Sequence, residues 1–165
     1  MPERLQLAVA DSTPIISLAL IGKLDLLRHL YCQVVVPPAV QREVLAGGPG
    51  ALGHAELQQA TWLQVIPLQD VRRADMLSDL DRGEAEVIAL AQELNADLAI
   101  IDERLARRHA KRLGLILTGT LGVLLKAKNT GLVPSVAPLV EQRLRGGIRL
   151  SDTVVAEALR LAEET

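Results

Sequence analysis

Aromatic side chains are almost absent from this chain of 165 residues, which has no phenylalanine, one tryptophan and one tyrosine. A hydrophobic core must therefore be built from Leu, Val, Ile and Ala, which keep the hydrophobic content at 49%. Trp62 and Tyr31 are the only aromatic rings, so the composition disfavours proteins that bind single-stranded nucleic acid by stacking bases on aromatic platforms.

Cysteine and long apolar runs are also scarce. Cys32 is the only cysteine, which excludes an internal disulfide and a zinc site made of cysteines. The sequence contains no run of about 18 uncharged apolar residues that could span a membrane. The apolar run before Asp11 is too short for the apolar region of a signal peptide. We therefore expect a cytoplasmic protein of one domain, without membrane contact.

Basic residues are not in excess, since the formal net charge is −2. Balanced totals can still conceal separate patches, and one segment is dense in positive charge. Its cations recur at i, i+3, i+4 and i+7, which places them on one face of a helix: Arg104, Arg107, Arg108 and Lys111. This face is suited to an RNA phosphate backbone, and the alternative is an ordinary solvated helix surface.

Short apolar segments alternate with helical patterns along the chain. The predicted strands cover residues 6–10, 33–36, 62–66, 98–101 and 115–117. The helix after the first strand is expected to be capped by Ser12 or Thr13. Such alternation is typical of an α/β protein, here a three-layer α/β/α sandwich around a parallel sheet of four to five strands. Extra helices are predicted at the C-terminal end.

Two aspartates directly follow predicted strands. Asp11 comes after the first strand and Asp102 after the fourth. In open α/β sheets, ligands bind at the carboxyl ends of the strands, so both side chains are candidates for a site. Either aspartate alone is equally compatible with a helix cap. Two of them in one sheet are harder to attribute to capping.

Two glutamates in predicted helices are further candidates. Without further evidence, Glu43 is predicted to be a solvent-facing residue of the helix after the second strand. Glu84 and Glu86 stand at the start of a later helix, where acids stabilise the positive helix end. Because the two are separated by two positions, they cannot face the same way on the helix.

Four stretches in the right order give the chain a resemblance to PIN domains. The stretch 11–16, Asp-Ser-Thr-Pro-Ile-Ile, is similar to the opening PIN motif. The stretches 36–44, 83–91 and 98–102 resemble the segments that carry the second, third and fourth PIN acids. The resemblance covers about residues 5–131. Residues 118–131 and the extension of about 132–165 resemble a subgroup of bacterial and archaeal PIN-like proteins of unassigned function.

The resemblance implies a single domain of residues 1–165 with a metal-dependent ribonuclease site. It assigns Asp11, Glu43, Glu84 and Asp102 as catalytic acids that bind Mg²⁺ or Mn²⁺, ions that prefer carboxylate and water ligands. Many PIN toxins have Asp as the third acid, where this chain has Glu84, and Glu86 competes for the role. Ser12 and Thr13 are expected to orient the carboxylates. The resemblance further implies RNA as substrate and a toxin with a small antitoxin as its partner.

Two other functions and an assembly are compatible with parts of the sequence. The main alternative is a catalytically inactive PIN-like module that binds RNA or protein, and the presence of all four acids favours the enzyme. A phosphoaspartyl enzyme needs a second Asp two positions after the first, where Thr13 stands. The apolar helices after Leu121 would expose much surface in a lone chain, so we expect a homodimer.

Overall fold

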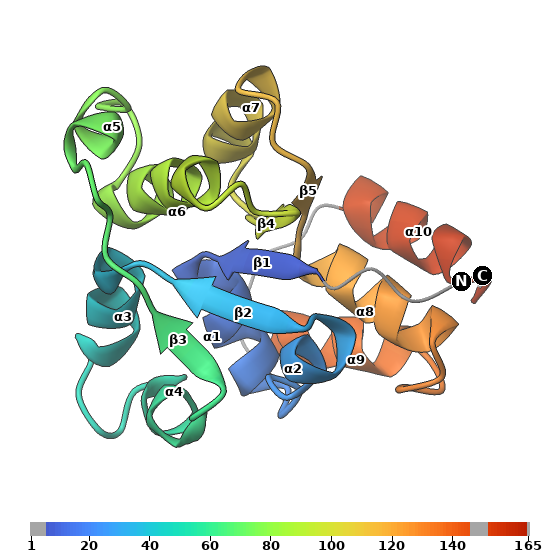
Figure 1. Ribbon diagram of the computed structural model, residues 1–165. Helices are drawn as coiled ribbons and strands as arrows, with labels where there is room; N and C mark the ends of the chain where they lie inside the picture. The colour runs from blue at the N-terminus through green and yellow to red at the C-terminus, as the bar shows by residue number, and fades with distance from the viewer. Residues whose placement is uncertain (1–5, 146–151, 165) are drawn as a thin grey trace.

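A five-stranded parallel sheet forms the centre of the protein (Figure 1). A computed structural model describes residues 6–145 and 152–164, so residues 1–5, 146–151 and 165 of the predicted domain lie outside the described part. The strand order β3-β2-β1-β4-β5 confirms the predicted parallel sheet. The strands are β1 (Leu7–Ala10), β2 (Gln33–Val36), β3 (Leu63–Val65), β4 (Leu98–Ile100) and β5 (Leu117–Thr118).

Helices cover both faces of this sheet, which confirms the predicted three-layer sandwich. The described helices are α1 (Ser12–Leu20), α2 (Leu26–Leu30), α3 (Pro38–Leu45), α4 (His54–Gln59), α5 (Arg72–Asp75), α6 (Arg82–Glu93), α7 (Arg104–Arg112), α8 (Thr120–Asn129), α9 (Ala137–Arg145) and α10 (Asp152–Leu161). Helices α6 and α7 lie on one face, and α1, α2 and α8 on the other. Helix α3 packs against both α1 and α6 beside the carboxyl ends of β1 and β2 (Figure 1).

Strand β1 lies between β2 and β4 and is almost wholly buried. Val9 pairs with Val35 on one side and Ala99 on the other, and all three side chains are inaccessible or nearly so. Because the strands are parallel, the carboxyl ends of β1 and β4 point to the same edge of the sheet. The backbone N–H of Asp11 donates to the carbonyl of Ile100 across this edge at 3.0 Å. The predicted parallel sheet thus places Asp11 and Asp102 after two adjacent strands, β1 and β4.

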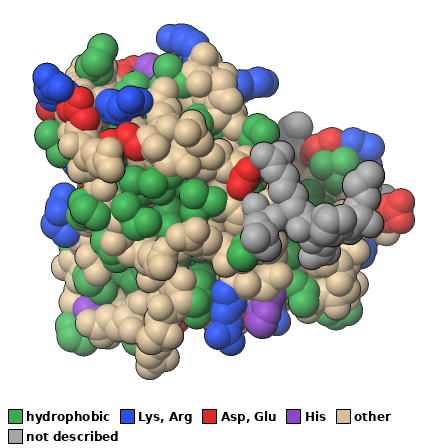
Figure 2. Space-filling view, in the orientation of Figure 1, with side chains coloured by type: hydrophobic (Ala, Val, Ile, Leu, Met, Phe, Trp, Pro, Cys, Tyr) green, Lys and Arg blue, Asp and Glu red, His purple; other side chains and the backbone are tan. Residues whose placement is uncertain are grey.

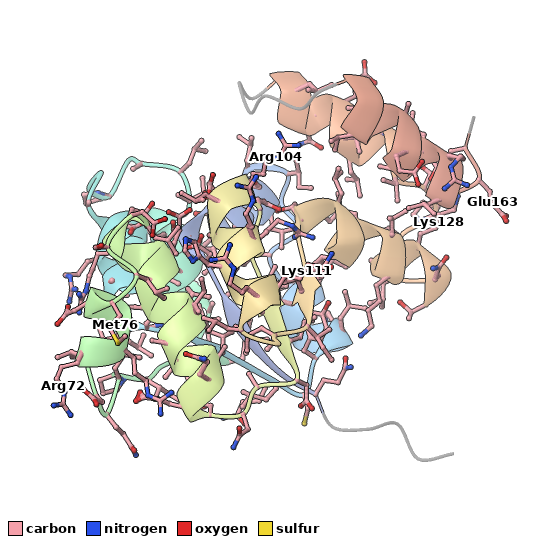
Figure 3. The ribbon with its side chains drawn as sticks, turned by 90° about the horizontal axis from the view of Figure 1, so that it is seen from above. Arg72, Met76, Arg104, Lys111, Lys128 and Glu163 are labelled. Atoms are coloured by element: carbon pink, nitrogen blue, oxygen red, sulfur yellow. The ribbon has the colours of Figure 1, made fainter. Side chains whose placement is uncertain are left out.

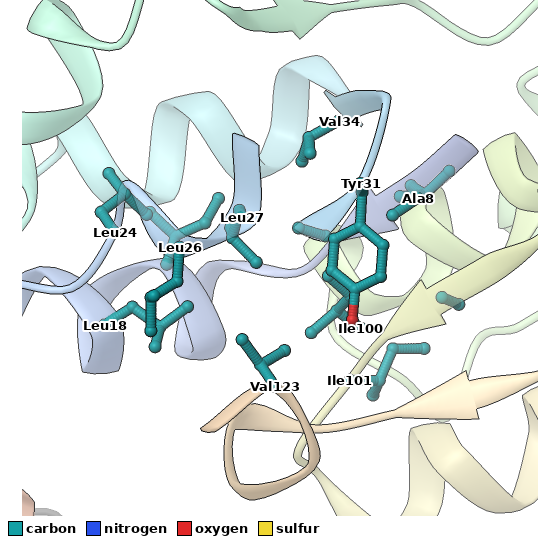
Figure 4. Close-up of a cluster of buried hydrophobic side chains, with 14 of the residues drawn as sticks. Ala8, Leu18, Leu24, Leu26, Leu27, Tyr31, Val34, Ile100, Ile101 and Val123 are labelled. Atoms are coloured by element: carbon teal, nitrogen blue, oxygen red, sulfur yellow. The ribbon is translucent and has the colours of Figure 1, made fainter. Parts of the chain in front are cut away.

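The core is aliphatic, as the composition requires. Figure 4 shows Leu18, Leu27 and Ile100 among the side chains that fill the space between the sheet and helices α1, α2 and α8. A fully buried side chain of this kind stabilises the fold by about 1.5–3 kcal/mol. Tyr31 is the one aromatic ring in the cluster. Burial raises the pKa of its hydroxyl to about 12, and the Lys126 ammonium lies 4.4 Å from the ring centroid.

The start of α1 differs from the prediction that Ser12 or Thr13 caps this helix. The N-cap is Asp11, whose extended backbone (φ −84°, ψ 167°) lets its carboxylate accept the N–H of Ser12 at 2.8 Å. Strand β1 therefore passes into the helix without an intervening loop, and Ser12 becomes the first helical residue. The capping role and the site role of Asp11 are thus compatible. No helix in the described part is long and apolar enough to cross a membrane.

Candidate functional site

Asp11 lies at the centre of a group of acids beside the carboxyl end of β1. Its side chain is 2% exposed. Burial raises the pKa of the Asp11 carboxyl from an ordinary 3.8 to about 7, although the hydrogen bond from Ser12 N–H opposes the change. The negative charges of Asp81, Glu43 and Asp102 raise it further. These acids are therefore close enough to repel one another.

Glu84 joins this group through the first turn of α6. Asp81 caps the helix by accepting the N–H of Glu84 at 2.8 Å, while Asp81 N–H donates to Glu84 Oε1 at 3.1 Å. Glu84 is 7% exposed. Burial, and then the hydrogen bond between its carboxyl and that of Asp81, raise the pKa of Glu84 to about 8. At neutral pH the metal-free protein therefore keeps Glu84 largely protonated.

Glu103, at the start of α7, extends the acidic group on the far side of Glu84. Its carboxylate accepts the N–H of Ala106 at 2.8 Å. Burial acts to raise the pKa of Glu103, but hydrogen bonds from Ala106 N–H and from the Glu84 side chain hold it below its ordinary value. Glu103 is thus a further acid in hydrogen-bond contact with Glu84. The sequence analysis did not anticipate Asp81 or Glu103, although Asp81 and Glu84 have the spacing of a capping box.

Glu43 reaches the group from α3. Its side chain is exposed overall, but Oε2 accepts a hydrogen bond from Ser12 Oγ at 2.7 Å. The carboxylate lies over Gly83 so closely that a Cβ at that position would collide with it. Ser12 therefore contacts one of the predicted acids, whereas Thr13 is exposed, and the orienting role of both residues stays a prediction.

Asp102 is held by the segment that joins β5 to α8. Thr120 N–H donates to Asp102 Oδ1 at 2.7 Å, and Thr120 Oγ1 donates to Oδ2 at 2.5 Å. Arg107 turns from α7 toward the same place and donates to the carbonyl of Ile101 at 2.6 Å. A cation thus stands close to Asp102. Thr120 was not predicted, since a threonine before an apolar helix gives no local signal of a distant carboxylate partner.

Glu86, the competitor of Glu84, faces another part of the molecule. One carboxylate oxygen accepts from Arg82 Nε at 2.7 Å, and the other accepts from Ala39 N–H at 3.3 Å. Glu86 therefore joins α6 to the start of α3 and has a cationic partner. This arrangement favours Glu84 as the third acid of the site, which stays a prediction.

The cationic face predicted on α7 is divided in the structure. Arg104, Arg108 and Lys111 are exposed, whereas Arg107 is half-buried. Figure 3 shows Arg104 and Lys111 at opposite ends of the helix. On the face seen in Figure 2, hydrophobic side chains gather in the middle and Lys and Arg side chains lie toward the margins. Among the coloured side chains of that face, Lys and Arg form no continuous patch.

The acidic group has the donor chemistry of a site for a hard divalent cation. All its side-chain donors are carboxylate oxygens, which Mg²⁺ and Mn²⁺ prefer. The raised pKa values of Asp11 and Glu84 indicate that negative charge is unfavourable there without a cation. Within residues 6–145 and 152–164, no three Asp, Glu, His or Cys side chains form a ready-made set of metal ligands. Binding would therefore require the carboxylates to draw together.

Comparison with known families gives a match over nearly the whole chain. The profile of a PIN-domain family matches residues 7–164, which includes the C-terminal helices. PIN domains are generally nucleases, and they typically use divalent metals. No curated protein matches the sequence.

Proposed function

The chain belongs to the PIN-domain family, and on that premise we propose that it is a ribonuclease that uses Mg²⁺ or Mn²⁺ to hydrolyse RNA phosphodiester bonds. The observation that carries the proposal is the crowding of Asp11 and Glu84 with other acids in a nearly inaccessible position. Burying mutually repelling carboxylates costs stability, and a bound cation would offset that cost.

Four acids would hold the metal in this proposal. Asp11 and Asp102 are the most direct ligands, because short side chains beside strand ends are held rigidly. Glu43 and Glu84 reach in from helices α3 and α6 and act through water or by rotating inward. Asp81 keeps Glu84 at the site through the capping box, and Ser12 does the same for Glu43.

The chemistry proposed is attack of a water molecule in line with the leaving oxygen. A bound divalent ion would supply a water of lowered pKa and neutralise the charge that grows on the phosphate. Asp11 and Glu84 would have to release their protons to become ligands. Arg107, beside Asp102, is placed to attract a phosphate oxygen. The family resemblance implies a product with a 5′-phosphate.

RNA would reach the site along α7. Arg104, Arg108 and Lys111 are exposed on the helix that begins two residues after Asp102, so a phosphate backbone held there would pass the acids. A toxin role with a small antitoxin partner is proposed on the family alone, because a fold does not determine a biological role.

A homodimer is the proposed assembly. The supporting observation is a set of large apolar side chains in and beside the last three helices, each between 42% and 52% exposed: Leu132, Leu144, Val154 and Leu161. A dimer that joined these side chains across its interface would remove them from water. Light scattering that shows only monomer at high concentration would refute this part of the proposal.

A cleavage assay on varied RNAs tests the central proposal. The wild type should cut RNA with Mg²⁺ or Mn²⁺ and stop when the metal is chelated. Asp11→Asn keeps the side-chain shape and removes the charge, so it should abolish cleavage in a folded protein. Cleavage by Asp11→Asn at the wild-type rate in saturating Mn²⁺ would refute the metal-nuclease proposal. Wild-type protein that binds RNA without metal and never cleaves it would instead be a binding module.

A further inference from the structure

Thr120 holds the Asp102 carboxylate by both of its oxygens. The backbone N–H donates to Oδ1 at 2.7 Å and the hydroxyl donates to Oδ2 at 2.5 Å. Thr120 is the first residue of α8 and is fully inaccessible to solvent. Hydrogen bonds to an ionised acceptor are stronger and shorter than neutral ones. Two of them from one buried residue fix the position of the carboxylate and also its rotation.

Gly119 makes this close approach feasible. A Cβ on this residue would lie 2.6 Å from Asp102 Oδ1 and 3.2 Å from Arg107 Nη1. The backbone of Gly119 is extended (φ −132°, ψ −172°), a conformation open to any residue. Glycine is therefore not required by backbone strain at this position. The requirement is spatial, since only a residue without a side chain lets α8 begin against the carboxylate.

Two other acids of the site, Asp11 and Glu43, are held less completely by their neighbours. Asp11 accepts one hydrogen bond, from Ser12 N–H, and Glu43 accepts one, from Ser12 Oγ. Asp102 is thus oriented in advance by two hydrogen bonds from one buried residue.

We propose that Thr120 is a positioning residue, which fixes the rotation of the Asp102 carboxylate in which it ligates the divalent metal. This inference rests on the proposed function of the acidic group. It assigns a role to the segment Thr118-Gly119-Thr120, in which Gly119 provides the space and Thr120 the two hydrogen bonds. Groups that orient metal ligands typically change metal affinity or activity by about 10- to 100-fold when they are removed.

The test compares Thr120→Val with Thr120→Ser. Valine keeps the shape and the backbone N–H and removes the hydroxyl, whereas serine keeps both hydrogen bonds. Mn²⁺ affinity is measured by electron paramagnetic resonance, with circular dichroism to verify folding. We expect Thr120→Val to weaken Mn²⁺ binding about tenfold or more. Thr120→Ser should remain within about threefold of the wild type, because the hydroxyl donor is retained.

Gly119→Ala gives a second route to the same result if Thr120→Val fails to fold. The added Cβ displaces the Asp102 carboxylate while Thr120 is unchanged, so Mn²⁺ binding should weaken in this variant too. In saturating Mn²⁺, the KM of each folded variant for RNA should stay near the wild-type value while kcat falls. A residue with a merely structural role would lower the thermal stability of the protein without changing the Mn²⁺ affinity of the folded fraction.

Two results separate this inference from the proposed function. Wild-type Mn²⁺ affinity in folded Thr120→Val or Gly119→Ala, together with cleavage of RNA by the wild type, would overturn the positioning role alone. Wild-type protein that binds Mn²⁺ but cuts no RNA would contradict the ribonuclease proposal. If Thr120→Val then bound Mn²⁺ at least tenfold more weakly and Thr120→Ser did not, the positioning role would stand.

Discussion

Two glutamates in one turn of α6 are buried to the same degree but differ in their surroundings. Glu84 is 7% exposed and Glu86 is 6% exposed. Glu86 has an arginine at 2.7 Å and a backbone N–H as partners. Glu84 is bonded to two other acids, Asp81 and Glu103, and burial and the Asp81 bond raise its pKa to about 8. Burial alone therefore does not distinguish a structural acid from a functional one.

The difference lies in how the negative charge is compensated. The charge of Glu86 is matched within the fold, so its side chain fastens α6 to α3. In the proposed function, a bound cation takes the place of the proton that Glu84 retains at neutral pH. Strongly perturbed acids without a compensating cation are typical of functional sites, whereas ion-paired ones are often structural.

The largest expected difference between substitutions of Glu84 and Glu86 is in the rate of RNA cleavage. Removal of a group that only orients a metal ligand typically lowers metal affinity or activity by about 10- to 100-fold. Glu84→Gln removes a proposed ligand itself, so it should slow Mn²⁺-dependent RNA cleavage by at least about 100-fold. Glu86→Gln is the matched control, and its folded fraction should cut within a few-fold of the wild type. Equal losses in both variants, measured as kcat/KM, would abolish the distinction.

The free energy of unfolding should depend on the surroundings of Glu86 and not on the charge of Glu84. Arg82→Met leaves the buried Glu86 carboxylate without its cationic partner, so the free energy of unfolding should fall by about 1–3 kcal/mol. Glu84→Gln is uncharged at every pH, so folding no longer requires this buried side chain to take up a proton, and the metal-free protein should be as stable as the wild type or more so. Urea unfolding of both variants without metal measures the difference. A large loss of stability in Glu84→Gln would show that Glu84 also has a structural role.

The pH dependence of stability follows from the raised pKa values. In the native metal-free protein Asp11 and Glu84 retain protons that the unfolded chain releases above about pH 4. Their contribution to stability is therefore full below pH 4 and is lost as the pH rises through about 7 to 8. Asp11→Asn should make this fall shallower in denaturant unfolding from pH 4 to pH 9. If the free energy of unfolding of Asp11→Asn fell with pH as steeply as that of the wild type, the raised pKa of Asp11 would be contradicted.

The sequence was sufficient to predict the parallel sheet and the place of two aspartates beside its strand ends. Strand–Asp–helix patterns at Asp11 and Asp102 are local, and parallel pairing brings the two aspartates to one edge. The orientation of Glu84 and Glu86 in opposite directions also follows from helical spacing. For the third acid the spacing gave only a preference, because the partner of Glu86 on α3 is 47 residues away in sequence.

Local sequence patterns could not predict which residues surround the acids. Thr120 is 18 positions from Asp102, and nothing local marks it as a hydrogen-bond donor to that carboxylate. The expected cap at Ser12 or Thr13 was wrong, because Asp11 itself accepts the first free N–H of α1. Arg107 belongs to the predicted cationic face by its spacing, but the fold turns its guanidinium toward Asp102.

The smallest expected effect concerns the exposed cations of α7. If Arg104 and Lys111 hold the RNA backbone, Ala at either position should weaken binding and reduce the slope of log affinity against log salt by about 0.7 to 0.9. The same change at Arg82, which pairs with Glu86, should leave the slope unaltered. Filter binding at several salt concentrations gives the slopes, and unchanged values at Arg104 and Lys111 would show that α7 is simply solvated.

The central claim is that the acids around Asp11 and Glu84 form a cation site, whereas Glu86 belongs to the scaffold. Calorimetric titration of Mn²⁺ into the wild type, Glu84→Gln and Glu86→Gln at pH 8 tests it most directly. We predict binding to the wild type and to Glu86→Gln with similar affinity, and binding at least about tenfold weaker to Glu84→Gln. Equal Mn²⁺ affinity in the wild type and Glu84→Gln, or a loss confined to Glu86→Gln, would contradict the account.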